Sequence, residues 1–313
     1  MACTLSVPAF ADDVAQPAPP PPPGGKMRIE VRDAMPLHGR AYVTQGRRVR
    51  LIGHVHPFVA GQVVRLRISS PHRKTAVVRA KVHGGGGDGV FSTSFPARRA
   101  VKYTITASHP PTPQQGFYFA RAAIKAIDVR AAGPGSRGPA VSLLKQALSA
   151  LGYPAGGGPS WTDKLGREVM AFRKTNRMAR VFTANRAVFS MVFAGKGAFR
   201  LRHPEAGKHV EFDWSRQVLA LADGAKPVAV YHASSGKPST PTVFGSFHFY
   251  MKAPGTNAKG MYDSNYFVRG YAVHGYPDVP TYAASHGCIR VPNADAPTIF
   301  GWIAVGDPIF VYR

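Results

Sequence analysis

The sequence predicts a multidomain chain with an N-terminal all-β sandwich, a small three-helix domain and a mainly-β C-terminal domain. Three observations support this prediction. Apolar and polar residues alternate over residues 26–130, apolar residues recur every three or four positions over 131–195, and strand and turn patterns return over 209–313. A length of 313 residues suits two or three domains.

The first residues predict export. Ala9-Phe10-Ala11 fits a small-x-small cleavage site, so residues 1–11 are predicted to be the remnant of a signal peptide and 12–25 a proline-rich linker. We expect the true translation start to lie upstream, because no basic segment precedes the apolar part. The alternative is a disordered N-terminus with a chance Ala-Phe-Ala. The sequence contains no run of about 18 apolar residues, so we expect no transmembrane helix.

Residues 26–130 predict short strands with one buried and one wet face. Val64, Leu66 and Ile68 alternate with Arg65 and Arg67, and similar alternations recur along the segment. This region resembles the immunoglobulin-like domains of exported actinobacterial wall proteins.

The same segment contains one candidate metal site. His54 and His56 could bind a metal, although two histidines on a strand are more often surface residues. No catalytic grouping of residues is visible between 26 and 130.

Residues 131–195 predict helices. Val141, Leu144, Leu148 and Leu151 define one apolar face, Pro139 suits its first turn and Gly152 its end. A second helix carries Val169, Phe172 and Met178. The segment resembles a peptidoglycan-binding domain of the small three-helix type, with Arg173 where that family usually has Gln. The alternative is a helical spacer without a ligand, and residues 196–208 are predicted to be a linker.

Residues 209–313 return to strands. Apolar runs flank Asp223-Gly224 as in a hairpin, and further strand patterns cover 247–251, 271–273 and 309–312. The segment 294–305 predicts the main helix of this region.

The charge is unevenly distributed along the chain. Residues 26–208 contain 32 basic and 7 acidic residues, a net charge of +25, whereas 209–313 contain 8 and 7, a net charge of +1. A basic excess predicts a polyanionic partner such as an anionic wall polymer. Export and the lack of any DNA-binding motif argue against nucleic acid. The alternative is a compositional bias towards arginine.

Cysteine usage singles out one thiol. Cys3 lies in the predicted leader, so Cys288 is the one cysteine predicted to remain in the mature chain, near His274, His286 and Arg290. A thiol with a pKa near ~8.5 is mostly protonated at neutral pH. We therefore expect an imidazole to lower the pKa of the Cys288 thiol by forming a thiolate–imidazolium pair.

His274 is the better base candidate, because it can approach from a neighbouring strand. Gly287 lets the backbone turn, so the N–H groups of residues 286–288 can face an oxyanion. His286, two residues from Cys288, can share its face in an extended segment. The alternatives are an inert buried cysteine or a zinc site formed by His274, His286 and Cys288.

His274-Gly275 followed by Ser285-His286-Gly287-Cys288-Ile289-Arg290 resembles the active site of YkuD-type L,D-transpeptidases. Five further segments match this family, at residues 234–238, 240–242, 254–257, 295–296 and 306–307. The resemblance implies a Cys288 nucleophile, a His274 base and no cofactor or metal. It assigns the remaining roles as follows: Gly275, Ser285, His286 and Gly287 support catalysis, and Arg290, Tyr262, Met261 and Ser285 bind substrate. Ten residues separate His274 from Ser285, fewer than in many members, which can reshape the pocket mouth.

The function implied is peptidoglycan L,D-transpeptidation, which forms 3–3 cross-links through a Cys288 thioester in the wall or a periplasm-like space. The partners implied are stem peptides and glycan strands, and Arg290 suits a stem carboxylate. β-Lactams of the carbapenem type are the expected covalent inhibitors. The alternatives are an L,D-carboxypeptidase, which uses water as acceptor, and a non-catalytic wall-binding protein.

Overall fold

A computed structural model describes residues 20–71 and 73–313. The predicted leader, Cys3 and the start of the proline-rich linker lie outside these ranges. The described chain divides into two compact units. The first contains the segments up to Ala34, Gly46–Ala97 and Val101–Lys125, and the second contains Met35–Gln45, Arg98–Ala100 and Ala126–Arg313.

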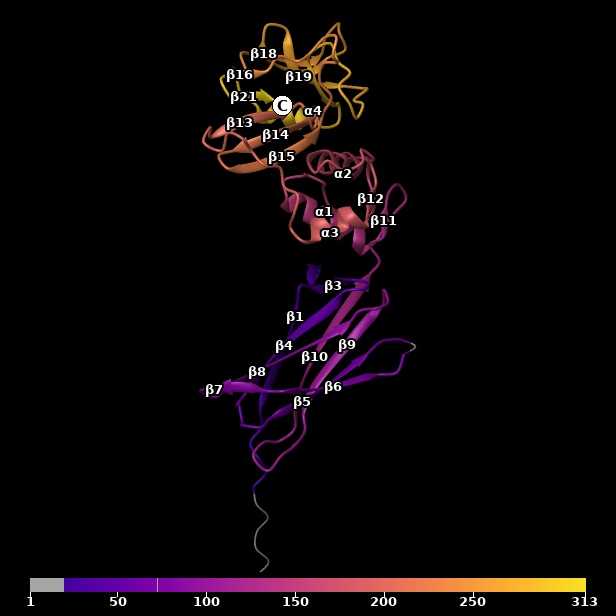
Figure 1. Ribbon diagram of the computed structural model, residues 1–313, viewed down its shortest axis with the longest axis vertical. Helices are drawn as coiled ribbons and strands as arrows, with labels where there is room; N and C mark the ends of the chain where they lie inside the picture. Colours follow the sequence, from indigo (N-terminus) through magenta and orange to yellow (C-terminus); the bar gives the residue numbers. More distant parts are fainter. Residues whose placement is uncertain (1–19, 72) are drawn as a thin grey trace, which may run out of the picture. The chain divides into compact units, whose positions relative to one another are not determined.

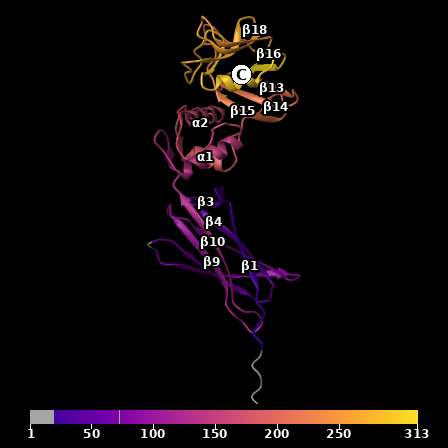
Figure 2. The ribbon, with the colours of Figure 1, turned by 180° about the vertical axis from the view of Figure 1, so that it is seen from behind.

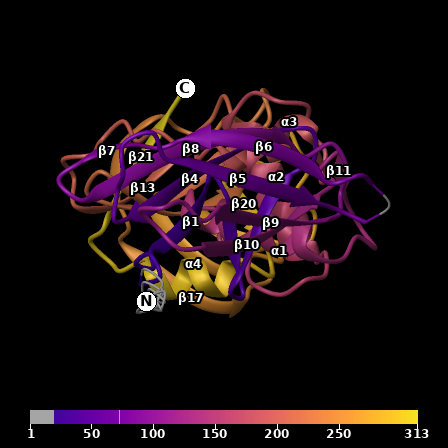
Figure 3. The same cartoon turned by 90° about the horizontal axis from the view of Figure 1, so that it is seen from below.

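The first unit consists of two antiparallel sheets, in agreement with the predicted all-β sandwich. Its strands run with the orders β1-β4-β8-β7 and β10-β9-β5-β6 (Figure 1; Figure 3 shows them from below). The rings of Phe95 and Tyr103, one from each sheet, have centroids 5.5 Å apart. The immunoglobulin-like kinship stays a prediction. The strand bounds are β1 Lys26–Arg32, β4 Arg48–His56, β5 Val63–Ser69, β6 Ala76–Lys81, β7 His83–Gly85, β8 Asp88–Pro96, β9 Lys102–His109 and β10 Tyr118–Ile127.

Helices α1 and α2 of the second unit form where the apolar periodicity places them, and a third helix, α3, follows them in the chain. Helix α1 has Pro139 in its first turn, and Gly152 follows its end with a φ of +89°. Helix α2 begins after Thr162, whose hydroxyl accepts the Leu165 N–H. It ends before Met178, which the sequence had placed on this helix. The bounds are α1 Pro139–Ala150, α2 Asp163–Thr175 and α3 Arg186–Phe193, with short strand pairs β2 Met35–Leu37 and β3 Arg40–Thr44, and β11 Ala131–Ala132 and β12 Ala184–Asn185.

The C-terminal part contains two sheets with a shared core. The first has the order β15-β14-β13-β21-β16, and the second β17-β18-β19-β20. Apolar side chains of both sheets and of α4 form one buried cluster. The predicted hairpin at Asp223-Gly224 is confirmed. The bounds are β13 Lys208–Asp213, β14 Val218–Asp223, β15 Lys226–His232, β16 Gly245–His248, β17 Met251–Thr256, β18 Tyr262–Val268, β19 Tyr271–Tyr276, β20 Ile289–Pro292, α4 Ala296–Trp302 and β21 Pro308–Tyr312.

Strand β14 is buried on both faces. Leu219 and Leu221 face the C-terminal core, whereas Val218 and Ala220 pack with the helices. Helix α2 lies along β15 in both Figure 1 and Figure 2. The helices and the C-terminal sheet therefore share a hydrophobic core and form one unit, which explains why the β14 sequence is continuously apolar. The domain boundaries expected within this unit stay predictions.

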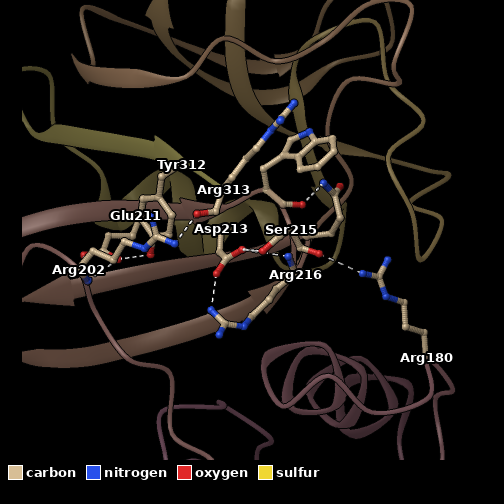
Figure 4. Close-up of polar contacts among 10 residues, drawn as sticks. Arg180, Arg202, Glu211, Asp213, Ser215, Arg216, Tyr312 and Arg313 are labelled. Carbon is tan, nitrogen blue, oxygen red and sulfur yellow. Dashed lines mark hydrogen bonds and ion pairs between the residues drawn. The ribbon is translucent and has the colours of Figure 1, made fainter.

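The segment predicted as a linker at 196–208 is fixed to the sheet. The buried Glu211 carboxylate accepts the backbone N–H group of Arg202 at 2.9 Å (Figure 4). It also accepts the backbone N–H group of His203 at 2.7 Å. The Tyr312 hydroxyl also donates to Glu211, and Arg202 donates to the Arg313 carbonyl. These contacts tie the connection between the helices and β13 to the central strands.

Helix α4 is shorter than the predicted segment 294–305. It spans Ala296–Trp302, and Ile303 returns to extended backbone with a ψ of +133°. Among the described residues, no helix combines the length and the apolar character needed to cross a bilayer.

Candidate active site

Cys288, His274 and Arg290 come together on one face of the parallel pair β19–β20. The register aligns Val273 with Ile289 and His274 with Arg290. Val273 and Ile289 point into the C-terminal core. Since side chains alternate along a strand, His274 and Arg290 occupy the opposite face, and Cys288, two residues before Arg290, shares it. His274 therefore lies on the strand next to β20, as the sequence predicted.

His274 is oriented as a base requires. The imidazole is buried, and its Nδ1–H donates to the Gly275 carbonyl oxygen at 2.8 Å. That tautomer leaves Nε2 unprotonated and able to accept a proton. A side chain at Gly275 would have its Cβ 2.7 Å from the Ala296 Cβ, so glycine is required for the close packing here.

The structure disfavours the predicted thiolate–imidazolium pair. Burial raises the pKa of the Cys288 thiol, an effect only partly offset by the Ala272 backbone and the charge of Arg290. Burial and the charge of Arg290 lower the pKa of His274 to about 4, despite the bond to Gly275. Both shifts favour neutral partners because a partly buried site penalises ions. The directions of both pKa shifts therefore favour a neutral thiol and a neutral imidazole. The Cys288 thiol itself donates to the Gly270 carbonyl, 3.7 Å from Sγ.

The Ser-His-Gly-Cys segment is held by its own serine. The Ser285 hydroxyl donates to the Cys288 carbonyl at 2.6 Å and accepts the Gly287 N–H at 3.0 Å. Gly287 has a φ of +125°, and an added Cβ would lie 2.3 Å from the Tyr271 ring.

This geometry revises two expectations. Because the Gly287 N–H is bound to Ser285, the N–H groups of His286 and Cys288 remain as the candidate oxyanion donors. The non-extended Gly287 also breaks the geometry expected to place His286 and Cys288 on one face, and the His286 side chain is exposed.

The matching segment at 234–242 clamps this loop. Ser234 exchanges two backbone hydrogen bonds with Arg290, at 2.9 and 2.8 Å. The Ser235 carbonyl accepts the N–H groups of Ala284 and Ser285, each at 2.8 Å. The clamp fixes both ends of the segment that carries Cys288.

Two threonines complete the clamp. The Thr240 hydroxyl donates to the Ser285 carbonyl at 3.0 Å, and the Thr242 hydroxyl donates to the Gly287 carbonyl at 2.7 Å. The Gly236 N–H donates in turn to the Thr242 hydroxyl at 2.9 Å. These bonds give a physical reason for the Ser-Gly-x-Pro and Thr-Pro-Thr segments that sequence matching singled out.

Helix α2 supports the loop that precedes Ser285. Lys174 Nζ lies 2.7 Å from His232 Nδ1, 2.8 Å from the Ala233 carbonyl and 3.2 Å from the Gln217 carbonyl. His232 Nε2–H donates to the Val279 carbonyl at 2.9 Å, so its Nδ1 accepts from Lys174.

Lys174 and His232 form a buried pair, and their hydrogen-bond partners indicate which of the two carries the charge. Burial lowers the pKa values of both Lys174 and His232. Burial and the charge of Arg180 lower the pKa of Lys174 to about 6, which favours the neutral amine near pH 7. The three acceptors around Lys174 Nζ match the three N–H bonds of an ammonium group, and this geometry favours a charged lysine beside a neutral His232.

Two arginines add to this support. Arg180 donates to the Ser215 carbonyl at 3.4 Å (Figure 4). It also donates to the Thr281 carbonyl at 2.5 Å. Arg167 donates two hydrogen bonds to the Asp295 carboxylate, at 2.7 and 2.9 Å. Sequence reasoning missed Lys174, Arg167 and Arg180, because basic residues on a helix ordinarily indicate a solvated face.

The predicted substrate residues differ in their surroundings. The Arg290 guanidinium lies 4.0 Å from the centroid of the Tyr276 ring and forms no ion pair with any described residue. Tyr262 pairs with Gly275 across β18 and β19. Met261 is buried, and its N–H donates to Asn257. Arg290 is thus available for an anion, whereas contact of Met261 or Tyr262 with substrate stays a prediction.

The comparisons with known proteins identify the domain that carries these residues. The YkuD family model, described as the L,D-transpeptidase catalytic domain, matches residues 207–311. The crystal structure of the L,D-transpeptidase (residues 123–326) from Xylanimonas cellulosilytica is 30% identical, with a TM-score of 0.53 over 65% of this chain and 100% of that chain. The chain belongs to the YkuD L,D-transpeptidase family. The similarity to the Xylanimonas structure covers more of the chain than the family model does.

Two other solved structures are more distant. An L,D-transpeptidase from Stackebrandtia nassauensis is 17% identical, with a TM-score of 0.37 over 58% of this chain and 95% of that chain. The catalytic domain of the E. faecium L,D-transpeptidase is 25% identical, with a TM-score of 0.30 over 34% of this chain and 98% of that chain. Comparison with curated proteins found no match. The family model and the Xylanimonas structure confirm the YkuD catalytic domain; the immunoglobulin-like and peptidoglycan-binding assignments stay predictions.

The neutral thiol leads to a first prediction. Alkylation by iodoacetamide requires the thiolate, so the rate at Cys288 should rise about tenfold per pH unit from pH 6 to beyond pH 8.5, because the raised pKa keeps the thiol protonated. The measurement is intact-protein mass against time in buffers of constant ionic strength, with Cys288→Ala as the blank. A rate that is flat between pH 6 and 8 would indicate the ion pair instead.

Proposed function

We propose that the protein is an L,D-transpeptidase that forms 3–3 cross-links in peptidoglycan outside the cytoplasmic membrane. The observation that carries the proposal is the shared face of His274, Cys288 and Arg290 within a YkuD domain. A nucleophile, an oriented base and an unpaired cation side by side suit acyl transfer from an anionic peptide.

The acylation step uses these groups in order. Cys288 Sγ attacks the carbonyl carbon of the third stem residue while His274 Nε2 takes the thiol proton. The backbone N–H groups of His286 and Cys288 stabilise the oxyanion. The bond to the terminal D-alanine then breaks, His274 returns the proton to the leaving amine, and a thioester remains.

The second step resolves the thioester. The side-chain amine of another stem attacks the thioester carbonyl, His274 accepts the amine proton, and the thiol leaves with that proton. Arg290 binds a stem carboxylate through its planar fork, which the Tyr276 ring orients. Transfer to water instead would make the protein an L,D-carboxypeptidase.

The products distinguish these functions, and this is the second prediction. Purified tetrapeptide muropeptides, incubated with the whole chain, should give cross-linked dimers that mass spectrometry detects. Tripeptide monomers without dimers would indicate the carboxypeptidase, and unchanged substrate would indicate a wall-binding protein. Cys288→Ala, the matched control, should give neither product. A carbapenem should add its mass to the wild type and not to Cys288→Ala.

A third prediction separates the two histidines. His274→Ala should slow acylation by a carbapenem by ~10²–10⁴-fold, because the positioned base is lost. His286→Ala should slow it much less, since His286 is exposed and contributes its backbone. Thermal melting of both variants controls for folding. If a folded His274→Ala is acylated at the wild-type rate while His286→Ala loses most of its rate, His274 is not the base.

A further inference from the structure

One face of the first unit carries a dense array of basic side chains. It is the outward face of the sheet β10-β9-β5-β6, which we call the basic face. Its cations are exposed, and none of them forms an ion pair with a described residue. They are Arg65 and Arg67 on β5, Arg79 and Lys81 on β6, Lys102 on β9, and Arg121 and Lys125 on β10.

The strand register places like charges opposite one another. Arg65 faces Arg79 across β5 and β6, and Lys102 faces Lys125 across β9 and β10. Directly opposed like charges destabilise a sheet. Two such cross-strand pairs do not stabilise the isolated unit, which indicates that these basic residues have another role.

The other sheet provides the contrast. Residues 26–125 contain three carboxylates, those of Glu30, Asp33 and Asp88. Glu30 pairs with Arg28, Asp33 with Arg50, and Asp88 with His56. All three carboxylates therefore serve the β1-β4-β8-β7 sheet and its turns, and the basic face has no internal counter-charge.

The centre of the basic face is a row of hydroxyls. Thr104, Thr106 and Ser108 point outward along β9, in register with Arg67 and Arg65 on one side and with Arg121 on the other. Strands lie about 4.8 Å apart, so the cations of β5 and β10 flank this row ~10 Å apart. From Lys102 to Ser108 the row runs ~20 Å. At the β5–β6 end, Val63, Arg65, Arg79, Lys81 and Pro110 line a hollow of about 470 Å³.

We propose that the basic face binds a linear polyphosphodiester of the cell wall, laid along β9. Arginine, lysine and hydroxyl side chains are the groups that contact phosphodiester oxygens. The identification of the polymer as a wall component rests on the proposed function. The binding would hold the chain on the wall independently of the catalytic domain.

Two other polyanions fit less well. The central row has no aromatic side chain on which nucleobases could stack, and the Phe119 ring opposite Ser108 already carries the Arg121 guanidinium, 5.2 Å from its centroid. The exposed Val77 on β6 and Phe119 on β10 lie at opposite edges of these four strands, so they form no contiguous apolar patch that could enter a bilayer.

The test uses the full chain and a fluorescent glycerol-phosphate oligomer as the probe. The affinity should fall linearly with salt on logarithmic axes, with a slope set by the number of phosphates neutralised. The triple variant Arg65→Gln, Arg67→Gln, Arg79→Gln should bind about 100-fold more weakly at low salt, and its slope should be shallower by about two or three.

The matched control is Arg28→Gln, Arg32→Gln, Arg50→Gln, which removes the same charge from the opposite sheet. It should change the affinity less than threefold. Equal losses in both triple variants, or no binding by the wild type, would overturn the proposal. Binding to vesicles containing phosphatidylglycerol as tight as to the oligomer, and lost in the first triple variant, would assign the face to a membrane instead.

Acylation by a carbapenem gives an independent readout. Both triple variants should acylate at the wild-type rate, since no substituted residue lies in the catalytic unit. Loss of oligomer binding with intact acylation would leave the proposed function standing. Failure to cross-link muropeptides, with oligomer binding intact, would contradict the proposed function alone.

Discussion

The buried hydrogen bonds of Lys174 are the interaction on which the catalytic geometry depends. Its ammonium group satisfies three acceptors around the end of β15, and His232 passes the contact on to Val279 in the loop before Ser285. A buried ammonium without its acceptors is costly, so this set forms as a whole or is lost as a whole. Helix α2 thus contributes to the active site without touching Cys288.

The packing of β14 and β15 makes that contribution possible. Val218, Ala220 and Val230 join the core of the helices, whereas Leu219 and Leu221 join the core of the two C-terminal sheets. One hairpin therefore transmits the position of α2 to the Ser234–Thr242 clamp that follows β15. The clamp in turn holds the backbone on both sides of Cys288, next to the strand that carries His274. Such positioning is what the proposed acyl transfer requires.

The sequence predicted the parts of this site that lie close together along the chain. Helix α1 and the Asp223-Gly224 hairpin follow from local spacing and turn chemistry. The Cys288 and His274 assignments rest on cysteine usage and on the family motif, and their catalytic roles stay predictions. The support from Lys174 could not be predicted, because it joins residues 58 positions apart and a lysine on a helix ordinarily faces water. The direction of the pKa shift of Cys288 was also beyond the sequence, since burial raises the pKa and this effect is the largest.

The most direct test of this account is the unfolding free energy of Lys174→Met beside Lys164→Met, an exposed lysine of the same helix. Lys174→Met leaves two carbonyls and an imidazole without their donor, so it should cost about 3 kcal/mol or more, and hydrogen exchange should increase in residues 277–285. Lys164→Met should change the free energy by less than about 0.5 kcal/mol. Equal stability of the two variants, with unchanged exchange in that loop, would contradict the account.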